Sequence, residues 1–322
     1  MSAVLMSYAE AACAAVRDAM RADPSVVVMG EDVGTGGIFQ QYRGLKAEFG
    51  AARVIDTPIS ESTIMGAAVG MALAGVKPVV EMRVVDFALC ATDELVNQAA
   101  KARYMFGGQG RVALVARLPV GLWAGSAAQH SQSLEAWFAH IPGLVVVAPS
   151  TPADNYALLA ASLACGDPVV YMEHKELWGL KGEVDAAARV PLGKARVVQE
   201  GRDLTLVTWS RTLHEAVAAA QAVSRDGISV EVIDLRTLWP WDRATVLASA
   251  AKTRRLLVAH EAVQAAGLGA EIAAAVAEEL GVRVKRLGAP RIPVGYARSL
   301  EDEARVDRGR IAAAVQDFVK GG

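Results

Sequence analysis

Short runs of β-branched residues alternate with alanine-rich segments of helical length along almost the whole chain. In the first half, the run Val26–Val28 follows a segment of helical periodicity at residues 8–22, and a strand-like run at residues 77–81 precedes another helical segment at residues 86–104. Further strands are predicted at residues 111–117, 144–148 and 168–172. Such alternation is typical of a mostly parallel sheet with helices on both faces, so the predicted fold class is α/β.

The chain has 322 residues, which is too long for one typical domain and suits two of about 150 residues each. Periodicity fades between Glu173 and Gly193, where glycines and prolines mark turns, and a second alternation follows. Its strands are predicted at residues 204–208, 229–233, 256–259 and 282–287, and its helices at residues 211–224, 244–251, 269–280 and 308–319. We therefore predict two doubly wound domains, residues 1–186 and 187–322.

Charge and cysteine content narrow the class of protein. The 33 Lys and Arg nearly balance the 35 Asp and Glu without long runs of one sign, so no nucleic-acid or membrane partner is expected. Early charges disfavour an export signal, and no stretch of ~18 apolar residues offers a membrane helix. Cys13, Cys90 and Cys165 lie far apart and are expected to be reduced, buried thiols of a cytoplasmic protein.

The segment Asp56–Glu61 carries the first candidate site. Arg53–Ile55 has the character of a strand end, Pro58 cannot donate to a sheet, and Ser60 is a good N-cap for a helix that starts with Glu61. In open parallel sheets, ligands bind at such strand-to-helix turns. The alternative is that Glu61 only complements the positive end of the helix dipole.

The helix after Glu61 is unusually rich in small residues. Gly66 and Gly70 lie one helical turn apart among alanines, which predicts a bare surface that another backbone can approach closely.

Common catalytic motifs are missing from the sequence. The loop Gly34–Gly37 lacks the third glycine of a dinucleotide fingerprint because Phe39 takes its place. His214 and His260 are each followed by a glutamate but lack the second histidine of a zinc-protease motif, and the sequence contains no serine-nucleophile elbow or Walker loop. Hydrolase and metalloprotease functions therefore have no support.

The five histidines differ in context. His174, His214 and His260 are interpreted as cap or surface residues, and His140 as a turn or packing residue. His130 lies in a polar loop of small residues between two apolar elements, where a side chain is presented to its surroundings. From the residues alone, a structural role for His130 stays the more common alternative.

Several motifs together resemble one family at its own spacing, from about Tyr8 to about Leu300. They are GEDVG at Gly30, DTPISE at Asp56, VDFA at Val85, NQAAKARYMFGGQ at Asn97, AQHSQSLEAWFAHIPGL at Ala128, APSTPADN at Ala148, EHK at Glu173, KGEV at Lys181 and EVIDLRTLWPWD at Glu231. The chain resembles the beta subunit of the thiamine-diphosphate-dependent decarboxylating component of 2-oxo acid dehydrogenase complexes. The resemblance implies a transketolase-like pyrimidine-binding domain (residues 1–186) followed by a transketolase C-terminal domain (residues 187–322).

The resemblance also implies partners. Relatives that hold thiamine diphosphate alone carry a Gly-Asp-Gly motif, whereas this chain has only Gly166-Asp167-Pro168. It is therefore expected to supply half a cofactor site within an α2β2 heterotetramer, with Mg²⁺ and the diphosphate on the alpha subunit. The enzyme would be an oxidoreductase that decarboxylates a 2-oxo acid and passes the acyl group to the lipoyl domain of a dihydrolipoyl acyltransferase core.

Site residues follow from the matched motifs. Glu61 corresponds to the carboxyl group that hydrogen-bonds the cofactor's pyrimidine ring, with Ile59 and Phe87 as further cofactor contacts, and His130 to a histidine at the active-site mouth. Some members bind a structural K⁺ through backbone carbonyls, here those of Leu114, Ser162, Cys165 and Asp167.

Departures from the family pattern leave alternatives open. Glu94 replaces a common glutamine, and the loop at residues 118–123 and the region 281–305 diverge. VDFA and NQAAKARYMFGG are closer to acetoin-cleaving members, whereas LWPWD is closer to branched-chain ones, so pyruvate, branched-chain 2-oxo acids and acetoin stay open as substrates. A non-catalytic scaffold subunit of the same fold is the other alternative, and a stand-alone dinucleotide-binding oxidoreductase is disfavoured by the broken glycine pattern.

Overall fold

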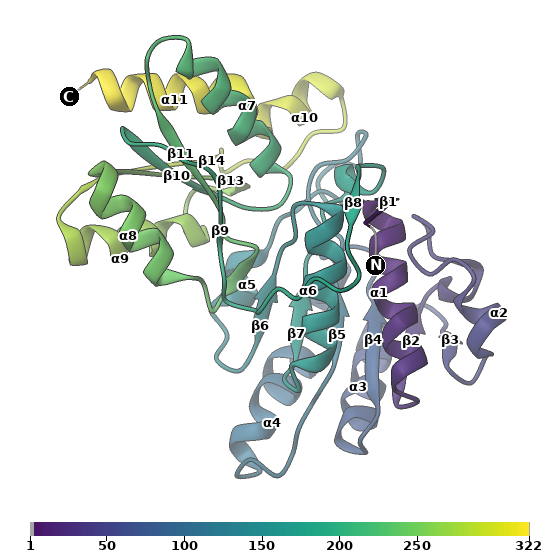
Figure 1. The fold of residues 1–322 in the computed structure, drawn as a ribbon. Helices are drawn as coiled ribbons and strands as arrows, with labels where there is room; N and C mark the ends of the chain where they lie inside the picture. Colours follow the sequence, from purple (N-terminus) through teal and green to yellow (C-terminus); the bar gives the residue numbers. More distant parts are fainter. Residues whose placement is uncertain (1–2, 322) are drawn as a thin grey trace. The chain divides into compact units, whose positions relative to one another are not determined.

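A computed structural model describes residues 3–321 and divides the chain into two compact units (Figure 1). Among the described residues, the first unit comprises residues 3–120 and 137–192, and the second comprises residues 121–136 and 193–321. The segment Gly121–Ala136 thus packs with the second unit, although its neighbours in sequence belong to the first. The α/β class and the two-domain transketolase-like architecture predicted from the sequence are confirmed.

The first unit is built on a parallel sheet with the strand order β6-β7-β5-β4-β2-β3. Its strands are β2 (Val26–Gly30), β3 (Val54–Asp56), β4 (Lys77–Glu81), β5 (Val115–Arg117), β6 (Val145–Val147) and β7 (Val169–Tyr171). The β-branched runs supply these strands because stiff side chains pack well on a sheet that is covered on both faces.

Helices α1 (Tyr8–Ala22) and α6 (Pro152–Ala164) pack on each other and on one face of this sheet. Each begins where the sequence predicts: Ser7 and Glu10 form a capping box for α1, and Thr151 caps α6 with Pro152 in its first turn. Helix α3 (Glu61–Leu73) packs against β4 outside this core cluster.

Three expectations for the first unit are wrong. The segment predicted as one helix at residues 86–104 is a 3₁₀ turn, η2 (Phe87–Ala91), a π-helical segment, η3 (Glu94–Ala99), and α4 (Ala100–Met105). The strand expected at residues 111–117 is regular only from Val115. Part of the expected linker is β8 (Lys181–Val184), which pairs antiparallel with β1 (Val4–Ser7), a strand too short to be recognised by periodicity.

The second unit has the strand order β14-β13-β10-β11-β9, with β9 antiparallel at one edge. Helices α7 and α11 pack together on one face, and α8 packs with α9 against β10 and β13. The strands are β9 (Arg196–Gln199), β10 (Leu204–Thr208), β11 (Val230–Asp234), β13 (Arg255–Val263) and β14 (Arg283–Ala289), besides β12 (Thr237–Trp239). The helices are α7 (Thr212–Ser224), α8 (Arg243–Thr253), α9 (Leu268–Leu280), α10 (Arg298–Ala304) and α11 (Arg308–Lys320).

Two short helices occur earlier in the chain, α2 (Leu45–Phe49) and α5 (Glu135–Ala139). In residues 3–321, helices of the length and apolarity needed to span a bilayer are absent.

A buried ion pair joins the carboxyl ends of neighbouring strands in the first unit. Arg117, the last residue of β5, is fully buried and donates to both carboxylate oxygens of Glu173, at 2.7 and 2.8 Å. Asn155 donates to Glu173 at 3.0 Å, and the guanidinium lies 4.8 Å from the centre of the Tyr42 ring. Burial alone would lower the pKa of Arg117, but the facing charge of Glu173 raises it above its ordinary value.

We predict that Glu173→Gln destabilises the chain by about 3–5 kcal/mol, because it leaves the Arg117 charge buried without its counter-ion. Urea unfolding of the full chain measures this change in the free energy of unfolding. Arg21→Gln, which breaks an ion pair whose arginine is 57% exposed, is the matched control and should change stability by less than ~1 kcal/mol. Equal effects of the two substitutions would contradict the role given to the buried pair.

Candidate functional site

Three strands of the first unit end side by side. Gly30 at the end of β2 lies in register with Asp56 at the end of β3 and with Glu81 at the end of β4. The chain passes from β2 to β3 on one side and returns to β4 on the other, so the direction of winding reverses at β2. This is the place in an open α/β sheet where ligands bind.

Gly30 lets the chain turn sharply at this edge. Its φ of 146° is unfavourable for other residues, and a Cβ atom there would lie 2.6 Å from the carbonyl oxygen of Glu81. The acids that follow are held by Arg83, which donates to Asp32 at 2.7 Å and lies 3.8 Å from Glu31. The GEDVG motif therefore places two carboxylates just beyond the end of β2, where they pair with an arginine just beyond the end of β4.

The turn at residues 56–61 is fixed by its early residues. The Thr57 amide donates to the Gly30 carbonyl at 3.1 Å, and Asp56 accepts from the Gly34 amide at 2.6 Å while it pairs with Lys46. The Lys46 hydrogen bond holds the pKa of Asp56 below its ordinary value.

Glu61 is the first residue of α3, as predicted. Ser60 occupies the N-cap position, but its hydroxyl donates to the Thr63 hydroxyl at 2.9 Å and does not cap a backbone amide. Within residues 3–321 the half-buried Glu61 side chain makes no hydrogen bond and no ion pair. Ile59, two residues earlier, is 76% exposed. The turn thus presents a carboxylate without a partner beside an exposed aliphatic side chain.

An aromatic residue lies on the element next to α3. Phe87 is half-buried and is the first residue of η2, which packs against α3. The Val85 amide donates to the Pro119 carbonyl at 2.8 Å, which fixes the start of this turn. The structure therefore brings the elements of Glu61 and Phe87 together. Their contacts with a cofactor stay a prediction.

The expected bare surface of α3 is partly filled. Glu94 in η3 accepts a hydrogen bond from Ser62, and its side chain lies 3.5 Å from where a Gly66 Cβ would stand. Only open space surrounds Gly70 in the described part of the chain.

Glu31 is a site residue that the sequence analysis missed. Burial raises the pKa of its carboxyl; Arg83 opposes this shift, while the charge of Glu61 adds to it. Glu31 and Glu61 are thus near enough to interact, although 30 residues separate them. The signal that could have revealed Glu31 is an acid directly after a glycine that ends a buried strand.

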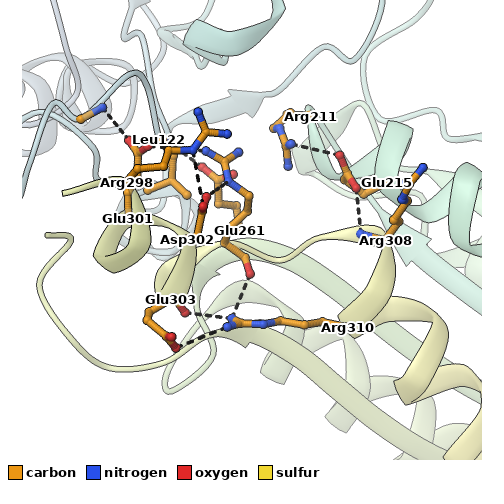
Figure 2. A network of polar contacts seen from close by, with 12 residues as sticks. Leu122, Arg211, Glu215, Glu261, Arg298, Glu301, Asp302, Glu303, Arg308 and Arg310 are labelled. Atoms are coloured by element: carbon orange, nitrogen blue, oxygen red, sulfur yellow. Dashed lines mark hydrogen bonds and ion pairs between the residues drawn. The ribbon is translucent and has the colours of Figure 1, made fainter. Parts of the chain in front are cut away.

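His130 lies in the second unit, exposed in the loop at residues 121–136. Carboxylates of the same unit hold this loop through its backbone amides: Leu122 donates to Glu261 at 2.8 Å and Gly125 donates to Glu301 at 3.1 Å (Figure 2). The Trp209 indole donates to Glu135 at 3.0 Å at the end of the loop. The loop is therefore a fixed structure that presents His130.

The residues predicted for a cation gather around the end of α6. Ser162, Cys165 and Asp167 lie in its last turn and just beyond, and the Leu114 carbonyl accepts from the Val169 amide at 2.9 Å. The K⁺ site stays a prediction. Within residues 3–321 no group of three or more His, Cys, Asp or Glu is arranged to hold a metal ion.

Two side-chain expectations are wrong. His260, expected to be a cap or surface residue, is fully buried, and its ring stacks on that of Trp209 with 5.1 Å between the ring centres. Burial lowers its pKa to about 4, so the side chain is neutral near pH 7. Of the three cysteines expected to be buried, Cys90 is exposed and Cys165 is half-buried, whereas Cys13 is buried as expected. His174 caps η4 (Lys175–Leu177) by accepting from the Glu176 amide at 3.1 Å.

Comparison with known proteins assigns both units. The family described as "Transketolase, pyrimidine binding domain" matches residues 5–180, and "Transketolase, C-terminal domain" matches residues 193–311. The acetoin:2,6-dichlorophenolindophenol oxidoreductase subunit beta of Cupriavidus necator is 41% identical over 96% of this chain and 96% of its own length. The 2-oxoisovalerate dehydrogenase subunit beta of Bacillus subtilis is 40% identical over 98% of this chain and 99% of its own length. The chain belongs to this family of dehydrogenase beta subunits.

Other members of the beta-subunit family are equally similar. The mitochondrial pyruvate dehydrogenase E1 component subunit beta-2 of Oryza sativa subsp. japonica is 43% identical over 92% of this chain and 81% of its own length. A solved structure described as a split gene transketolase, inactive beta4 tetramer, has a TM-score of 0.82 at 23% identity and covers 98% of this chain and 99% of that chain. This structural likeness concerns the fold alone.

We predict that Glu61→Gln lowers the raised pKa of Glu31, because it removes a neighbouring negative charge while burial persists. NMR titration of ¹³C-labelled glutamate carboxyl groups measures this pKa. Glu48→Gln removes an acid that pairs with Arg17 and Arg21 and should leave the pKa of Glu31 unchanged. A Glu31 titration that is identical in the wild type and Glu61→Gln would show that the two groups do not interact.

Proposed function

We propose that this chain is the beta subunit of a thiamine-diphosphate-dependent 2-oxo acid dehydrogenase, and that an alpha subunit completes its active site. The observation that carries the proposal is the Glu61 carboxylate, which lies without a partner at the strand edge of a chain about 40% identical to named dehydrogenase beta subunits. In this enzyme the pair of subunits decarboxylates a 2-oxo acid and reductively acylates a lipoyl domain.

The residues at the strand edge fit a heteroaromatic ring. Glu61 can hold a proton at a ring nitrogen, and Phe87 offers an aromatic face for packing. The exposed side chain of Ile59 can pack against an apolar part of the ring. Arg83 is occupied by Glu31 and Asp32. We therefore assign the diphosphate and its Mg²⁺ to the alpha subunit, in accord with the missing Gly-Asp-Gly motif.

The mechanism assigns separate tasks to this chain's side chains. When bound, thiamine diphosphate supplies the nucleophilic carbon and the electron sink for decarboxylation. Glu61 holds and returns a proton at the pyrimidine nitrogen, and Glu31 sets the charge around that carboxyl group. Ile59 and Phe87 orient the ring and exclude water. His130 provides a donor for the substrate and for acyl transfer to the lipoyl group.

Exposed apolar side chains support an alpha partner on the first unit. Leu73 is 45% exposed at the end of α3, and Tyr104, Met105 and Phe106 at the end of α4 are 90, 72 and 53% exposed. A monomer rarely shows such a group of large side chains to water. We propose that the alpha subunit covers them in a cytoplasmic α2β2 assembly that docks on a dihydrolipoyl acyltransferase core. The K⁺ at Leu114, Ser162, Cys165 and Asp167 belongs to this proposal.

The substrate is proposed only as a class. Relatives named for acetoin, 2-oxoisovalerate and pyruvate are 40 to 43% identical to this chain, so identity does not separate them. We propose a 2-oxo acid as the substrate, with acetoin as the alternative. The motif at Val85 is closer to acetoin-cleaving members and the motif at Leu238 is closer to branched-chain ones, so the motifs do not choose between the two. A substrate panel with the reconstituted alpha and beta subunits decides between them. Thiamine diphosphate binding that needs no alpha subunit would contradict the shared site.

We predict that Glu61→Gln lowers turnover of the reconstituted enzyme by at least about 100-fold, because positioned proton transfer contributes roughly 10²- to 10⁴-fold. Decarboxylation measured by release of carbon dioxide tests this. Glu48→Gln is the control acid in the same unit and should retain turnover. Near-normal activity of Glu61→Gln would end the proposed role, provided that circular dichroism shows both variants folded.

His130→Ala separates the two half-reactions. We expect it to slow acylation of a free lipoyl domain by at least about tenfold, the lower range for one lost hydrogen-bonding group. His140→Ala changes an exposed histidine elsewhere and should leave acylation unaffected. If His130→Ala keeps both decarboxylation and acylation at wild-type rates, His130 has a structural role only.

A further inference from the structure

A pocket of about 550 Å³ in the second unit has three arginines among its nine lining residues. Arg286 comes from β14, Arg291 from the loop after it, and Arg310 from the first turn of α11. Glu303 of α10 is the acid among the described lining residues. Three guanidinium groups and one carboxylate give the lining a formal charge of +2, in a chain whose net charge is −2.

The guanidinium groups retain donors for a ligand. Arg291 is exposed and makes no side-chain hydrogen bond or ion pair with the described residues. Arg286 donates one hydrogen bond, to the Gln264 carbonyl at 3.1 Å. Because a guanidinium carries five N–H donors, most of those on both side chains are available.

Arg310 is held in place at the pocket wall. It donates to the carbonyl oxygens of Glu303 at 2.8 Å and of Arg305 at 2.9 Å, and its other nitrogen lies 3.5 Å from the Glu303 carboxylate (Figure 2). These contacts order the guanidinium before a ligand arrives, so less rotamer freedom is lost on binding.

The floor of the pocket is rigid as well. The Gln264 amide donates to the Ala289 carbonyl at 2.9 Å, and the Gln264 side chain accepts from the Gly288 amide at 3.2 Å. A Cβ on Gly288 would lie 2.8 Å from the Ala262 carbonyl oxygen, so only glycine allows this close approach. The ends of β13 and β14 therefore form a fixed frame beneath the arginines.

Gathering like charges around one cavity is unfavourable unless an anion binds there. Guanidinium groups match the oxygens of phosphate, and arginines from three different elements suit a tetrahedral group better than a planar one. The cavity has the size of a small-molecule site. We propose that this pocket binds a small phosphate-bearing molecule. Six of its nine lining residues lie in the region 281–305, which departs from the family pattern. The proposal goes beyond the proposed catalytic function.

Isothermal titration of the full-length chain with inorganic phosphate tests the proposal, with acetate at equal ionic strength in a parallel arm. We expect saturable binding of phosphate and none of acetate. Arg291→Gln, which removes no contact of the folded chain, should weaken phosphate binding by about tenfold, the loss expected for one charged hydrogen bond. Arg286→Gln should have a similar effect.

Two further variants make the outcome decisive. Glu303→Gln removes the acid of the pocket and should tighten phosphate binding several-fold, in the opposite direction to the arginine variants. Arg202→Gln removes the same charge from a side chain that is 81% exposed elsewhere in the second unit, and it should leave the affinity unchanged. The proposal is overturned if phosphate does not saturate, if acetate binds equally well, or if Arg202→Gln weakens binding as much as Arg291→Gln.

Discussion

The buried pair of Arg117 and Glu173 is the interaction on which the geometry of the first unit depends. An uncompensated charge in a fold interior costs several kcal/mol, so the two side chains must keep their mutual geometry. Around them, Asn155 donates to Glu173, and Tyr42 stacks on the guanidinium while its hydroxyl donates to Glu81 at 2.6 Å. The carboxyl ends of β4 and β5 and the segment after β7 are thereby fixed relative to one another.

From this network the contacts lead to the candidate site. Gly30 packs closely against the backbone of Glu81. The residue after Gly30 is Glu31, so this contact links the buried network to the candidate site. Three other acids at this edge have basic partners: Asp56 pairs with Lys46, and Asp32 and Glu31 pair with Arg83. Glu61 is left without one, although a partner would stabilise its charge. A carboxylate outside the ion pairs of this edge fits the role in proton transfer that we propose for Glu61.

The sequence predicted what depends on local pattern and missed what depends on pairing. The bounds of α1 follow from periodicity and its capping box, and they were predicted correctly. The start of α3 at Glu61 was also predicted correctly, although Ser60 does not cap a backbone amide there. Strand β1 was missed because its four residues are defined only by pairing with β8, in which Val4 lies opposite Val184, 180 residues later. Residues 86–104 have helical composition, but the chain there follows the surface of α3 and adopts 3₁₀ and π geometry.

The same distinction applies to the site. Motifs led to the prediction of Glu61, Ile59, Phe87 and His130 as site residues, because these residues belong to contiguous segments with a family pattern. Glu31 was missed since its importance comes from its spatial neighbour Glu61, and His260 was placed on the surface since nothing local reveals that Trp209 covers it. Both outcomes depend on contacts between residues that are far apart in the sequence, and the periodicity of one sequence does not reveal such contacts.

Backbone strain gives His130 a physical distinction that the motif alone does not. Ala124 and Ala127 in its loop have φ values of 48° and 59°, a conformation that L-residues avoid and that costs of order 1–3 kcal/mol each. The strain persists because Glu261 and Glu301 each accept a backbone amide of the loop. A loop with only a connecting role could relax this strain by placing glycine at those positions. Its retention, together with two buried or half-buried carboxylates used as anchors, supports a loop shaped to hold an exposed histidine in one position.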